Sequence, residues 1–467
     1  MKETINVVIL AAGLGTRMKS KKAKVLHEAG GDTLLNHVIR AALQITQPER
    51  IVAVVGHQAD RVRESVRTAG VRFAEQREQK GTAHAVLCAR DAVDSREGLV
   101  LVLNGDGPLL QATTLHRLVT KQSGSGLGAT IVTTRLADPT GYGRILWDTE
   151  GMIAGIVEQK AATPSQLEIK EVNPGCYCFD AAALWRHIDD VQPNNPAHEY
   201  YITDMVEVLN RQGLRVASLL VEDETELLGI NTRVELAVAD KLLRARKAQA
   251  LMLAGVTIEQ PDTVTIDADV QAGEDSIVEA NVQLRGTTRI GSNCRVGTGT
   301  VLRDCIVEDG AEILPYVVAE NSVIGSSAYV GPFARLRMNA EVRPAAHVGN
   351  FVELKNTRLG EGSKANHLAY LGDASIGSKV NVGAGTITCN YDGERKHRTT
   401  IGEGAFVGSN STLVAPLSIA EGAYIGAGST ITKDVESDSL ALGRAHQVDK
   451  PGWAKKRRAR SKELATK

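Results

Sequence analysis

The sequence predicts an α/β protein in which a mainly parallel, Rossmann-like sheet is followed by a left-handed parallel β-helix of hexapeptide repeats. Two observations predict this fold. Short apolar runs alternate with helical segments in the first half of the chain, and aliphatic residues recur every six positions in the second half. At 467 residues the chain is long enough for two or three hydrophobic cores.

Four apolar, β-branched runs in the first half are expected to be strands buried on both faces of a sheet. Between them lie two segments with the apolar spacing of helices. Such alternation favours a parallel sheet, whose ligands bind at the carboxyl ends of its strands. The strand candidates are INVVILAAG (5–13), RIVAVVG (50–56), GLVLVLNGD (98–106) and GATIVTTRL (128–136), and the helix candidates are TLLNHVIRAALQI (33–45) and TAHAVLCARDAV (82–93).

From about residue 256 a period of six is typical of a β-helix, whose flat faces stack coil upon coil. The chain contains 45 glycines, and many follow these aliphatic residues, where they ease the bend at a corner. We expect two irregularities: a segment with His367 that interrupts the phase, and a loop between Cys389 and Thr400 ejected from a continuing core. The in-phase residues are Ile258, Val264 and Val270; Val278, Leu284, Ile290, Val296 and Leu302; Ile324, Val330, Leu336, Val342, Val348 and Leu354; Ile376 and Val382; and Ile401, Val407, Leu413, Ile419, Ile425 and Ile431.

These patterns predict four parts of the chain: the α/β domain over 1–230, a single linker helix over 231–255 that ends at Gly255, the β-helix over 256–445, and a basic tail over 446–467. The tail ends in WAKKRRARSKELATK, and we expect it to be solvated or disordered. Attraction of a phosphate group is the alternative.

Composition and charge exclude several classes of function. The formal net charge is -1, from 54 basic and 55 acidic residues, so no global field favours nucleic acid or an anionic membrane. The six cysteines show no C-x-x-C pair, which indicates reduced thiols without disulfides or a zinc site. The apolar run at the N-terminus is too short for a signal peptide or a membrane span. We therefore expect a cytoplasmic protein that neither binds nucleic acid nor inserts into a membrane.

A glycine loop, LAAGLGTRM (10–18), follows the first predicted strand. It is neither a Walker A loop nor a dinucleotide fingerprint, because Met18 replaces the third glycine. Backbone N–H groups of such a loop can close on an anion, and Arg17 and Lys24 can neutralise a polyphosphate. A tight turn followed by solvated lysines is the alternative. Asp106 lies just past another strand, where it could hold a metal-bound phosphate or simply cap a turn.

Further motifs extend this pattern along the chain: AEQREQKGTAHA (74–85), GYGRI (141–145), GIVEQK (155–160), EVNPGCY (171–177), EYYITD (199–204) and GINTR (229–233). With the hexapeptide repeats, this set resembles the bacterial bifunctional N-acetylglucosamine-1-phosphate uridylyltransferases and glucosamine-1-phosphate N-acetyltransferases, from residue 5 to about 453. The resemblance implies that acetyl-CoA acetylates glucosamine 1-phosphate. UMP then passes from UTP to N-acetylglucosamine 1-phosphate with release of pyrophosphate. It also implies Mg²⁺, a homotrimer assembled through the β-helix, and a role in supplying UDP-N-acetylglucosamine for peptidoglycan and lipopolysaccharide.

In the N-terminal domain the resemblance implies in-line attack on the α-phosphorus, with catalysis by positioning and by charge neutralisation from Mg²⁺, Arg17 and Lys24. Two residues depart from the family: Ala23 replaces a usual Pro, and Gly107 replaces a bulkier residue, so the loop is expected to be looser. The implied site residues are Leu10, Ala11, Ala12, Gly13, Gly15, Arg17 and Lys24 for the triphosphate; Gln76, Gly81 and Thr82 for uracil; Gly143, Glu158 and Asn173 for the sugar; and Asp106 and Asn231 for Mg²⁺.

In the β-helix the resemblance implies that His367 is the general base on the sugar amine, because an ammonium group cannot attack a thioester. A lone histidine is usually structural. The polar residues near His367 favour a catalytic role instead. Met338 replaces a usual Pro and is expected to shift Arg337. The implied partners are Arg337, Lys355, Tyr370 and Asn381 for glucosamine 1-phosphate, with Ala384, Asn390, Tyr391, Lys396, Ser409, Ala427 and Arg444 near the substrate or acetyl-CoA.

Two alternatives differ from this interpretation in what they require. A glucose-1-phosphate nucleotidyltransferase with a regulatory β-helix would have no need of His367, Tyr370 and the polar loop. A non-catalytic assembly or exchange-factor subunit would be expected to have lost Arg17, Lys24, Asp106 or Asn231, and all four are present.

Overall fold

The computed structural model describes residues 3–93 and 96–465 and divides into two compact units. The first unit ends at Lys247 and also includes residues 266–268, and the second contains the rest. The division falls inside helix α8 (Arg233–Leu253), which lies within the range 231–255 of the predicted helix. Gly255 follows it with φ of 95°, a conformation that suits glycine at a helix C-terminus.

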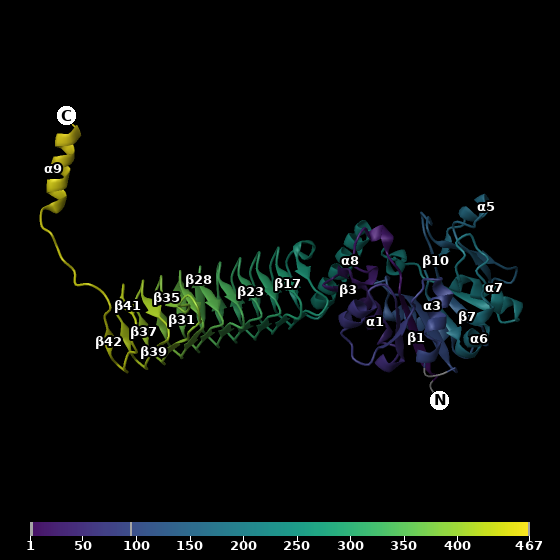
Figure 1. The fold of residues 1–467 in the computed structure, drawn as a ribbon, viewed down its shortest axis with the longest axis horizontal. Coiled ribbons are helices and arrows are strands. Elements are labelled where there is room, and N and C mark those ends of the chain that lie inside the picture. The colour runs from purple at the N-terminus through teal and green to yellow at the C-terminus, as the bar shows by residue number, and fades with distance from the viewer. Residues whose placement is uncertain (1–2, 94–95, 466–467) are drawn as a thin grey trace. The chain divides into compact units, whose positions relative to one another are not determined.

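The first unit is built on a ten-stranded sheet, drawn in purple to teal in Figure 1. Its order is β5-β4-β1-β6-β11-β7-β10-β8-β9, with β12 beside β7. One half is parallel. It contains the predicted strands β1 (Ile5–Ala11), β4 (Ile51–Val55) and β6 (Leu99–Asn104), together with β5 (Arg72–Glu75), which was not predicted. In the other half β7 (Ala129–Arg135) and β12 (Val216–Leu220) are parallel, whereas β8 (Gly143–Trp147), β9 (Ile153–Val157), β10 (Glu171–Asn173) and β11 (Tyr177–Asp180) pair in antiparallel fashion.

Helices cover both faces of this sheet, as the apolar strands predict. Val8 packs into one hydrophobic cluster, and its neighbours Val7 and Ile9 pack into another. The first cluster includes α3 (Thr82–Cys88), α6 (Ala181–His187) and α7 (Met205–Arg211), and the second includes α1 (Leu34–Ala42), α2 (Ala59–Ser65) and α4 (Ala112–Gln122). The carboxyl ends of β1, β4, β5 and β6 therefore meet at one edge, where the glycine loop, Gln76 and Asp106 follow.

The second unit consists of three parallel sheets whose strands stack like rungs (Figure 1). This confirms the predicted β-helix. Each strand pairs with the strand one coil later, and the residue that faces inward in one coil lies on its counterpart in the next. We call the sheets face 1, face 2 and face 3. Face 1 has eleven strands from β13 (Thr257–Ile258) to β42 (Leu440–Ala441), face 2 has ten ending at β41 (Thr430–Ile431), and face 3 has nine from β15 (Gln271–Ala272) to β39 (Leu417–Ile419).

The expected shift of the six-residue phase around His367 is present, but the β-helix continues through it. Leu359, Ala365 and Leu371 occupy the inward positions there, and each is fully buried. The aliphatic phase shifts because a corner is one residue shorter: Val342 pairs with Leu359, and Leu359 pairs with Ile376. His367 therefore belongs to a regular coil. The expected ejected loop is confirmed, since β35 (Ile387–Cys389) and β36 (Thr399–Ile401) flank it without loss of register.

The basic tail differs from the expectation of disorder. Helix α9 (Trp453–Ala465) forms in it, and its described side chains are exposed, as solvation of the tail predicts. Arg457 lies over the ring of Trp453, with 5.4 Å to the ring centroid. Among the helices of residues 3–93 and 96–465, none combines the length and apolar character that crossing a membrane requires.

Candidate active sites

Two basic and two oxygen-bearing side chains meet at the carboxyl edge of the first unit's sheet. Lys24 Nζ forms an ion pair with Asp106 and lies 3.1 Å from Asn231 Oδ1, which also accepts from Arg17 Nη2 at 2.8 Å. The loop reaches Lys24 because Gly15 has φ of 62°, and a Cβ there would lie 2.6 Å from Lys24 Cβ. The structure thus brings together the four residues of the predicted phosphate and metal site.

Backbone contacts hold the two oxygen-bearing residues of this cluster in place. Ile230 N donates to Asp106 O at 2.9 Å, which ties the segment before α8 to the end of β6. Glu235, in the first turn of α8, accepts from Asn231 N at 2.6 Å and from Thr232 N at 2.8 Å. Glu235 was not predicted from the sequence, although an acidic residue near a helix start is a known capping signal.

The residues of the cluster fit a magnesium ion. One carboxylate and one amide oxygen, from distant segments of the chain, converge on the same ammonium group. Oxygen ligands of this kind are those that Mg²⁺ prefers, with water and phosphate oxygens completing its shell.

Gln76, Gly81 and Thr82 lie together beyond the end of β5. Gln76 is 4% exposed, and its Nε2 donates to Gly81 O at 2.9 Å. Gly81 cannot carry a side chain, because φ is 114° and a Cβ would lie 2.4 Å from Tyr200 O. Thr82 Oγ1 accepts from Ile202 N at 2.9 Å, so the segment around Ile202 is held against the start of α3.

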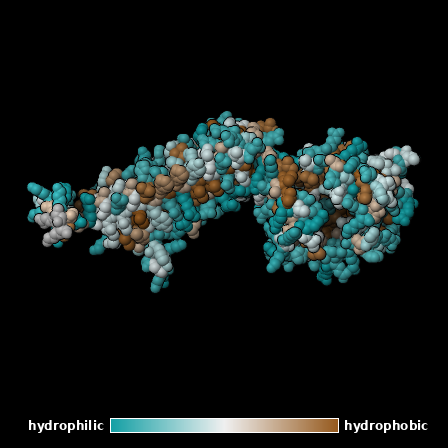
Figure 2. Space-filling view, turned by 90° about the horizontal axis from the view of Figure 1, so that it is seen from above, coloured by the Kyte–Doolittle hydropathy of each residue, from teal (hydrophilic) through white to brown (hydrophobic). Residues whose placement is uncertain are grey.

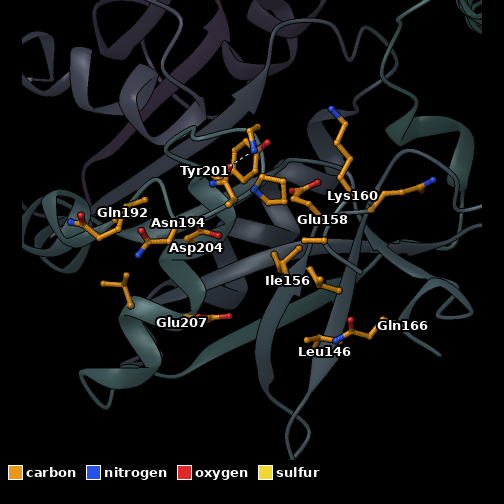
Figure 3. Close-up of a pocket in the computed structure, with 18 of the residues that line it drawn as sticks. Leu146, Ile156, Glu158, Lys160, Gln166, Gln192, Asn194, Tyr201, Asp204 and Glu207 are labelled. Atoms are coloured by element: carbon orange, nitrogen blue, oxygen red, sulfur yellow. Dashed lines mark hydrogen bonds between the residues drawn. The ribbon is translucent and has the colours of Figure 1, made fainter. Parts of the chain in front are cut away.

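A cavity of about 1030 Å³ connects Arg17 with the predicted sugar residue Glu158. Figure 3 shows Glu158 and Tyr201 close together in its upper part, Asp204 lower down at the start of α7, and Glu207 below it within α7. Thr203 Oγ1 donates to Glu158 Oε1 at 3.4 Å. Gly143 packs beneath Glu158, where a Cβ would lie 3.3 Å from Oε1. Tyr201, Thr203 and Asp204 belong to the EYYITD motif, but the sequence alone did not place them at this cavity.

Two carboxyl groups of the cavity have raised pKa values. Burial raises the pKa of Glu158, although the hydrogen bond from Thr203 opposes the shift. Burial, reinforced by the charges of Glu207 and Glu158, raises the pKa of Asp204 to about 6. Glu158 and Asp204 therefore ionise at higher pH than exposed carboxyl groups do.

Other predicted residues of the first unit lie near the cavity without lining it. Leu10 and Ala11 end β1, Ala12 follows it, and a Cβ on Gly13 would meet nothing within 4 Å, so the loop is open there. Asn173 is 8% exposed and does not line the cavity. Its Nδ2 donates to the hydroxyl of Tyr177 at 2.7 Å, and its Oδ1 accepts from Gly175 N at 3.1 Å.

The two departures in this unit are accommodated. Ala23 has φ of -56°, which proline could also adopt, and its N–H donates to Gln58 Oε1 at 3.1 Å. Gln58 Nε2 donates to Lys21 O at 2.6 Å, so Gln58 fastens the segment that proline would otherwise stiffen. A Cβ on Gly107 would come no closer than 3.8 Å to Asn104 O, which leaves space for a larger residue.

In the second unit, four predicted residues form a column along the edge between face 1 and face 2. Each lies two residues after an inward-facing residue of face 1, and backbone hydrogen bonds link successive coils. They are His367, Ala384, Ser409 and Ala427. His367 ends β31 (Lys364–His367), and its Nδ1 lies 2.9 Å from Oδ1 of Asn350, the residue of the same column one coil earlier.

The hydrogen bond to Asn350 determines how His367 can act. An amide oxygen can only accept, so Nδ1 carries the hydrogen and Nε2 has the free lone pair of the neutral ring. The side chain is exposed. His367 can therefore take a proton at Nε2 from a molecule that lies against this edge.

Arg337, Lys355 and Tyr370 lie on face 2, in three successive strands: β26 (Arg335–Arg337), β29 (Glu353–Lys355) and β32 (Tyr370–Gly372). Arg337 pairs in register with Lys355, and Lys355 with Gly372. The Tyr370 hydroxyl lies over Gly372, since a Cβ there would be 2.6 Å from it. Arg337 Nε donates to Glu353 Oε1 at 2.6 Å, and this bond raises the pKa of Arg337.

Asp373, which the sequence analysis missed, ties three side chains of this face together. It accepts from Lys355 Nζ at 2.6 Å, from Asn356 Nδ2 at 2.6 Å and from Asn390. Burial disfavours the charge of Asp373, but these hydrogen bonds outweigh it and lower its pKa. Lys355, Asp373 and Asn390 are all at least nine-tenths buried, so the network is rigid.

The loop after Asn390 is an ordered projection. Tyr391 and Lys396 pair as an isolated antiparallel bridge, and both are exposed. Asp392 closes the tip by accepting from Arg395 N at 2.6 Å and contacting His397 Nε2 at 2.6 Å. The Arg395 N–H and then His397 lower the pKa of Asp392 strongly.

The predicted acetyl-transfer residues do not all meet within one chain. His367 precedes β32 and Asp373 follows it, so His367 and the Lys355 network lie at opposite edges of face 2. Asn381 lies on face 1, in β34 (Asn381–Val382), and Arg444 follows β42 in an exposed segment. Met338 has φ of 55°, which proline cannot adopt, so the corner after Arg337 differs in conformation from one containing proline.

Comparison with known proteins gives two family matches and many close relatives. Residues 7–164 match the MobA-like NTP transferase domain, and residues 398–433 match the bacterial transferase hexapeptide (six repeats). The chain is similar to curated proteins named bifunctional protein GlmU. The one from Solibacter usitatus is 54% identical, with 99% of each chain covered. That of Anaeromyxobacter sp. (strain Fw109-5) is 52% identical, with 97% of this chain and 93% of the relative covered. That of Koribacter versatilis is 47% identical, with 98% of each covered.

Proposed function

The chain belongs to the family of the bifunctional protein GlmU, and from this premise we propose how its residues carry out two reactions. It is a transferase of UDP-N-acetylglucosamine synthesis, and so of cell-wall biosynthesis. The second unit acetylates glucosamine 1-phosphate with acetyl-CoA. The first unit transfers UMP from UTP to the resulting N-acetylglucosamine 1-phosphate and releases pyrophosphate.

For uridylyl transfer, Arg17 and Lys24 bind the triphosphate, and the open loop at Gly13 admits it. Lys24 then exchanges part of its contact with Asp106 for phosphate oxygens. The cavity from Arg17 to Glu158 takes the sugar, with its 1-phosphate toward Arg17. Because the sugar phosphate itself is the nucleophile, the protein needs only to align the two phosphates and offset their charge.

Asp106 and Asn231 would hold Mg²⁺ in this reaction, since they present a carboxylate and an amide oxygen to a common cation. When bound, the ion would neutralise phosphate charge as the α-phosphorus is attacked. Glu235 and the Ile230 N–H keep both oxygens in position.

For acetyl transfer, His367 accepts a proton from the sugar ammonium at Nε2, which frees the amine to attack the thioester carbonyl of acetyl-CoA. As the amide bond forms, the C–S bond breaks, and CoA leaves as a thiol after its sulfur takes up the second proton that the nitrogen loses. Arg337 and Lys355 bind the 1-phosphate, with the Tyr370 hydroxyl beside them. The column of Ala384, Ser409 and Ala427 below His367 accommodates the extended acetyl-CoA chain, and the loop with Tyr391 and Lys396 borders it.

The acetyl-transfer site is completed by another copy of the chain in a homotrimer. His367 and the Lys355 network lie at opposite edges of face 2, so a second chain is needed to supply one of them to a shared site. An exposed ladder of Tyr316, Phe333, Phe351 and Leu368 adjoins His367, and its aromatic rings stack at 5.2 and 5.3 Å. Figure 2 shows apolar patches on this β-helix among hydrophilic residues. Apolar surface of this kind favours contact with further copies.

A cytoplasmic location follows from the substrates and agrees with the cysteines, which are free within residues 3–93 and 96–465.

The observation that carries the proposed function is that one chain contains both the Arg17, Lys24, Asp106 and Asn231 cluster and the His367 column. The protein is mixed with glucosamine 1-phosphate, acetyl-CoA, UTP and Mg²⁺, and free CoA thiol and pyrophosphate are measured. Both products are expected. If pyrophosphate forms only when N-acetylglucosamine 1-phosphate is added, and no thiol is released, the protein would be a nucleotidyltransferase whose β-helix is regulatory. Absence of both would favour the non-catalytic subunit.

A further inference from the structure

Three hydrogen-bonding groups determine the orientation of the Gln76 amide in the first unit. Nε2 donates to Gly81 O at 2.9 Å and lies 3.0 Å from Nδ1 of His84. Each of its two hydrogens therefore has an acceptor. Gln76 Oε1 has no hydrogen-bond partner among the residues that the structure describes, and it is not sealed from solvent. The NH₂ end of the Gln76 side chain therefore faces the protein, and its carbonyl oxygen is left to accept from a ligand.

His84 can accept this hydrogen only if Nδ1 is unprotonated, which places the ring hydrogen on Nε2. The other side of the ring agrees with this tautomer, because Nε2 lies 3.9 Å from Cys88 Sγ, one helical turn later on α3. Burial raises the pKa of Cys88, so the sulfur stays a neutral thiol and accepts weakly from Nε2–H.

From this arrangement we propose that His84 is a positioning residue that sets the preference of uridylyl transfer for UTP over CTP. The inference rests on the proposed function and on Gln76 as a base-reading residue. With Nε2 held by Gly81 and His84, Gln76 presents an acceptor to the base. Uracil carries a hydrogen on N3 that this oxygen can accept, whereas N3 of cytosine is itself an acceptor. A site that holds an acceptor in place disfavours the base that cannot donate to it.

Replacement of His84 by Phe keeps a ring but removes the acceptor, so one hydrogen of Gln76 Nε2 loses its partner and the amide can turn. The ratio of kcat/KM for UTP to kcat/KM for CTP is expected to fall roughly tenfold, mainly through KM for UTP. His84→Leu provides a second side chain without an acceptor if the Phe variant does not fold. His84→Asn restores an acceptor, Oδ1, near the place of Nδ1, and its ratio is expected to stay within about twofold of wild type.

The measurement is pyrophosphate release from UTP and from CTP with N-acetylglucosamine 1-phosphate as acceptor. His116→Leu, on the exposed side of α4, is the matched control for loss of a histidine. An unchanged ratio in the acceptor-free variants, a fall in His84→Asn as large as theirs, or equal use of both nucleotides by the wild type would each overturn the role of His84. Absence of pyrophosphate from the wild type with UTP would instead overturn the proposed function.

Discussion

Asp204, in the proposed sugar cavity, lowers the stability of the folded protein at neutral pH. Its pKa is raised to about 6 by burial and by the charges of Glu207 and Glu158, compared with an ordinary value of 3.8. The folded protein thus holds this proton more tightly than the unfolded chain does. Asp204 favours the folded state fully below about pH 3.8, and that contribution is lost as the pH rises through about 6.

Asp204→Asn removes this loss because an amide does not ionise. At pH 7.5 the variant is expected to melt roughly 2–4 °C above wild type, and the difference should shrink as the pH falls toward 5. Thermal melts of both proteins across this range measure it. Asp91→Asn, at a side chain that is 99% exposed, should show no such trend. A difference in melting temperature that does not depend on pH would contradict the account.

We expect Asp373 to affect acetyl transfer through the side chains that it holds. Lys355 is 4% exposed, and in Asp373→Asn it would keep its charge without a counter-charge, while Asn356 and Asn390 would face a competing donor. We expect kcat/KM for glucosamine 1-phosphate to fall by roughly 100-fold with pyrophosphate release unchanged. Thiol and pyrophosphate assays on the same sample test this.

The β-helix offers a matched control for Asp373. Asp304 occupies the corresponding corner after β20 (Val301–Arg303), and both residues have positive φ, 52° and 49°. Asp304 accepts from the backbone and hydroxyl of Thr287 rather than from a buried lysine. Asp304→Asn should leave both activities intact, and an equal loss of acetyl transfer in the two variants would show a general effect on the coil.

At the scale of the element, the ejected loop is an insertion at a single corner. In the preceding coil only Asp373 joins β32 to β33 (Ala374–Ile376), and Asn390 has the same place after β35. Tyr370 pairs with Ile387 and Ala374 with Thr399, so the strands on both sides keep the register of the earlier coil. Removing residues 391–398 would leave Asn390 as a one-residue corner.

The deletion of residues 391–398 is therefore expected to leave a folded β-helix that lacks only the loop side chains. Acetyl transfer should fall by at least roughly 100-fold, while pyrophosphate release stays near wild type. Thiol release and a melting curve provide the test, and Glu394→Ala with Arg395→Ala serves as a control at the loop tip. If the deletion retains thiol release, the loop borders the site without contributing to it.

The sequence predicted the strands and the core of the β-helix because inward-facing aliphatics repeat every six residues and are visible without the structure. It did not reveal the length of each corner, so the phase shift near His367 was visible in the sequence but the regular coil that contains it was not. Asp373 and Asn350 were missed for the same reason. Their partners Asn390 and His367 lie a full coil away, so only the stacking of coils brings them together.

In the first unit β1, β4, β6 and β7 were predicted because their runs are nearly all apolar, whereas β5, with the sequence RFAE, has no such run and was missed. The half built from β8, β9, β10 and β11 was not assigned, since these strands are short and their pairing is antiparallel. Asp204 and Tyr201 line the cavity together with Ile156 and Val157 of β9, and Thr203 contacts Glu158. Only the family resemblance identified Glu158 beforehand.

At the scale of the whole molecule, assembly should matter for one activity only. Phe333 is 47% exposed and stacks between Tyr316 and Phe351, two coils before His367. Phe333→Glu places a charge in the ladder, which should dissociate the proposed trimer and abolish thiol release while pyrophosphate release continues. Sedimentation velocity and the two assays measure this. Ile306→Glu, at a 49% exposed residue of face 3, should remain trimeric, and dissociation by this variant instead would place the interface elsewhere.

The two units can be tested as separate enzymes that share an intermediate. Each has its own sheets and its own candidate site: Lys24 with Asp106 in the first and His367 with Asn350 in the second. Lys24→Ala should release thiol but no pyrophosphate, because the triphosphate loses a cation. His367→Ala should release pyrophosphate only when N-acetylglucosamine 1-phosphate is added.

Neither variant alone should form UDP-N-acetylglucosamine from glucosamine 1-phosphate, and an equimolar mixture should form it after a lag. The lag is expected because N-acetylglucosamine 1-phosphate must accumulate in solution before the first unit of the other variant can bind it. Product appearance is followed by chromatography, with added N-acetylglucosamine 1-phosphate as the control that abolishes the lag. A mixture that stays inactive while each variant keeps its single activity would mean that the intermediate does not pass freely between molecules.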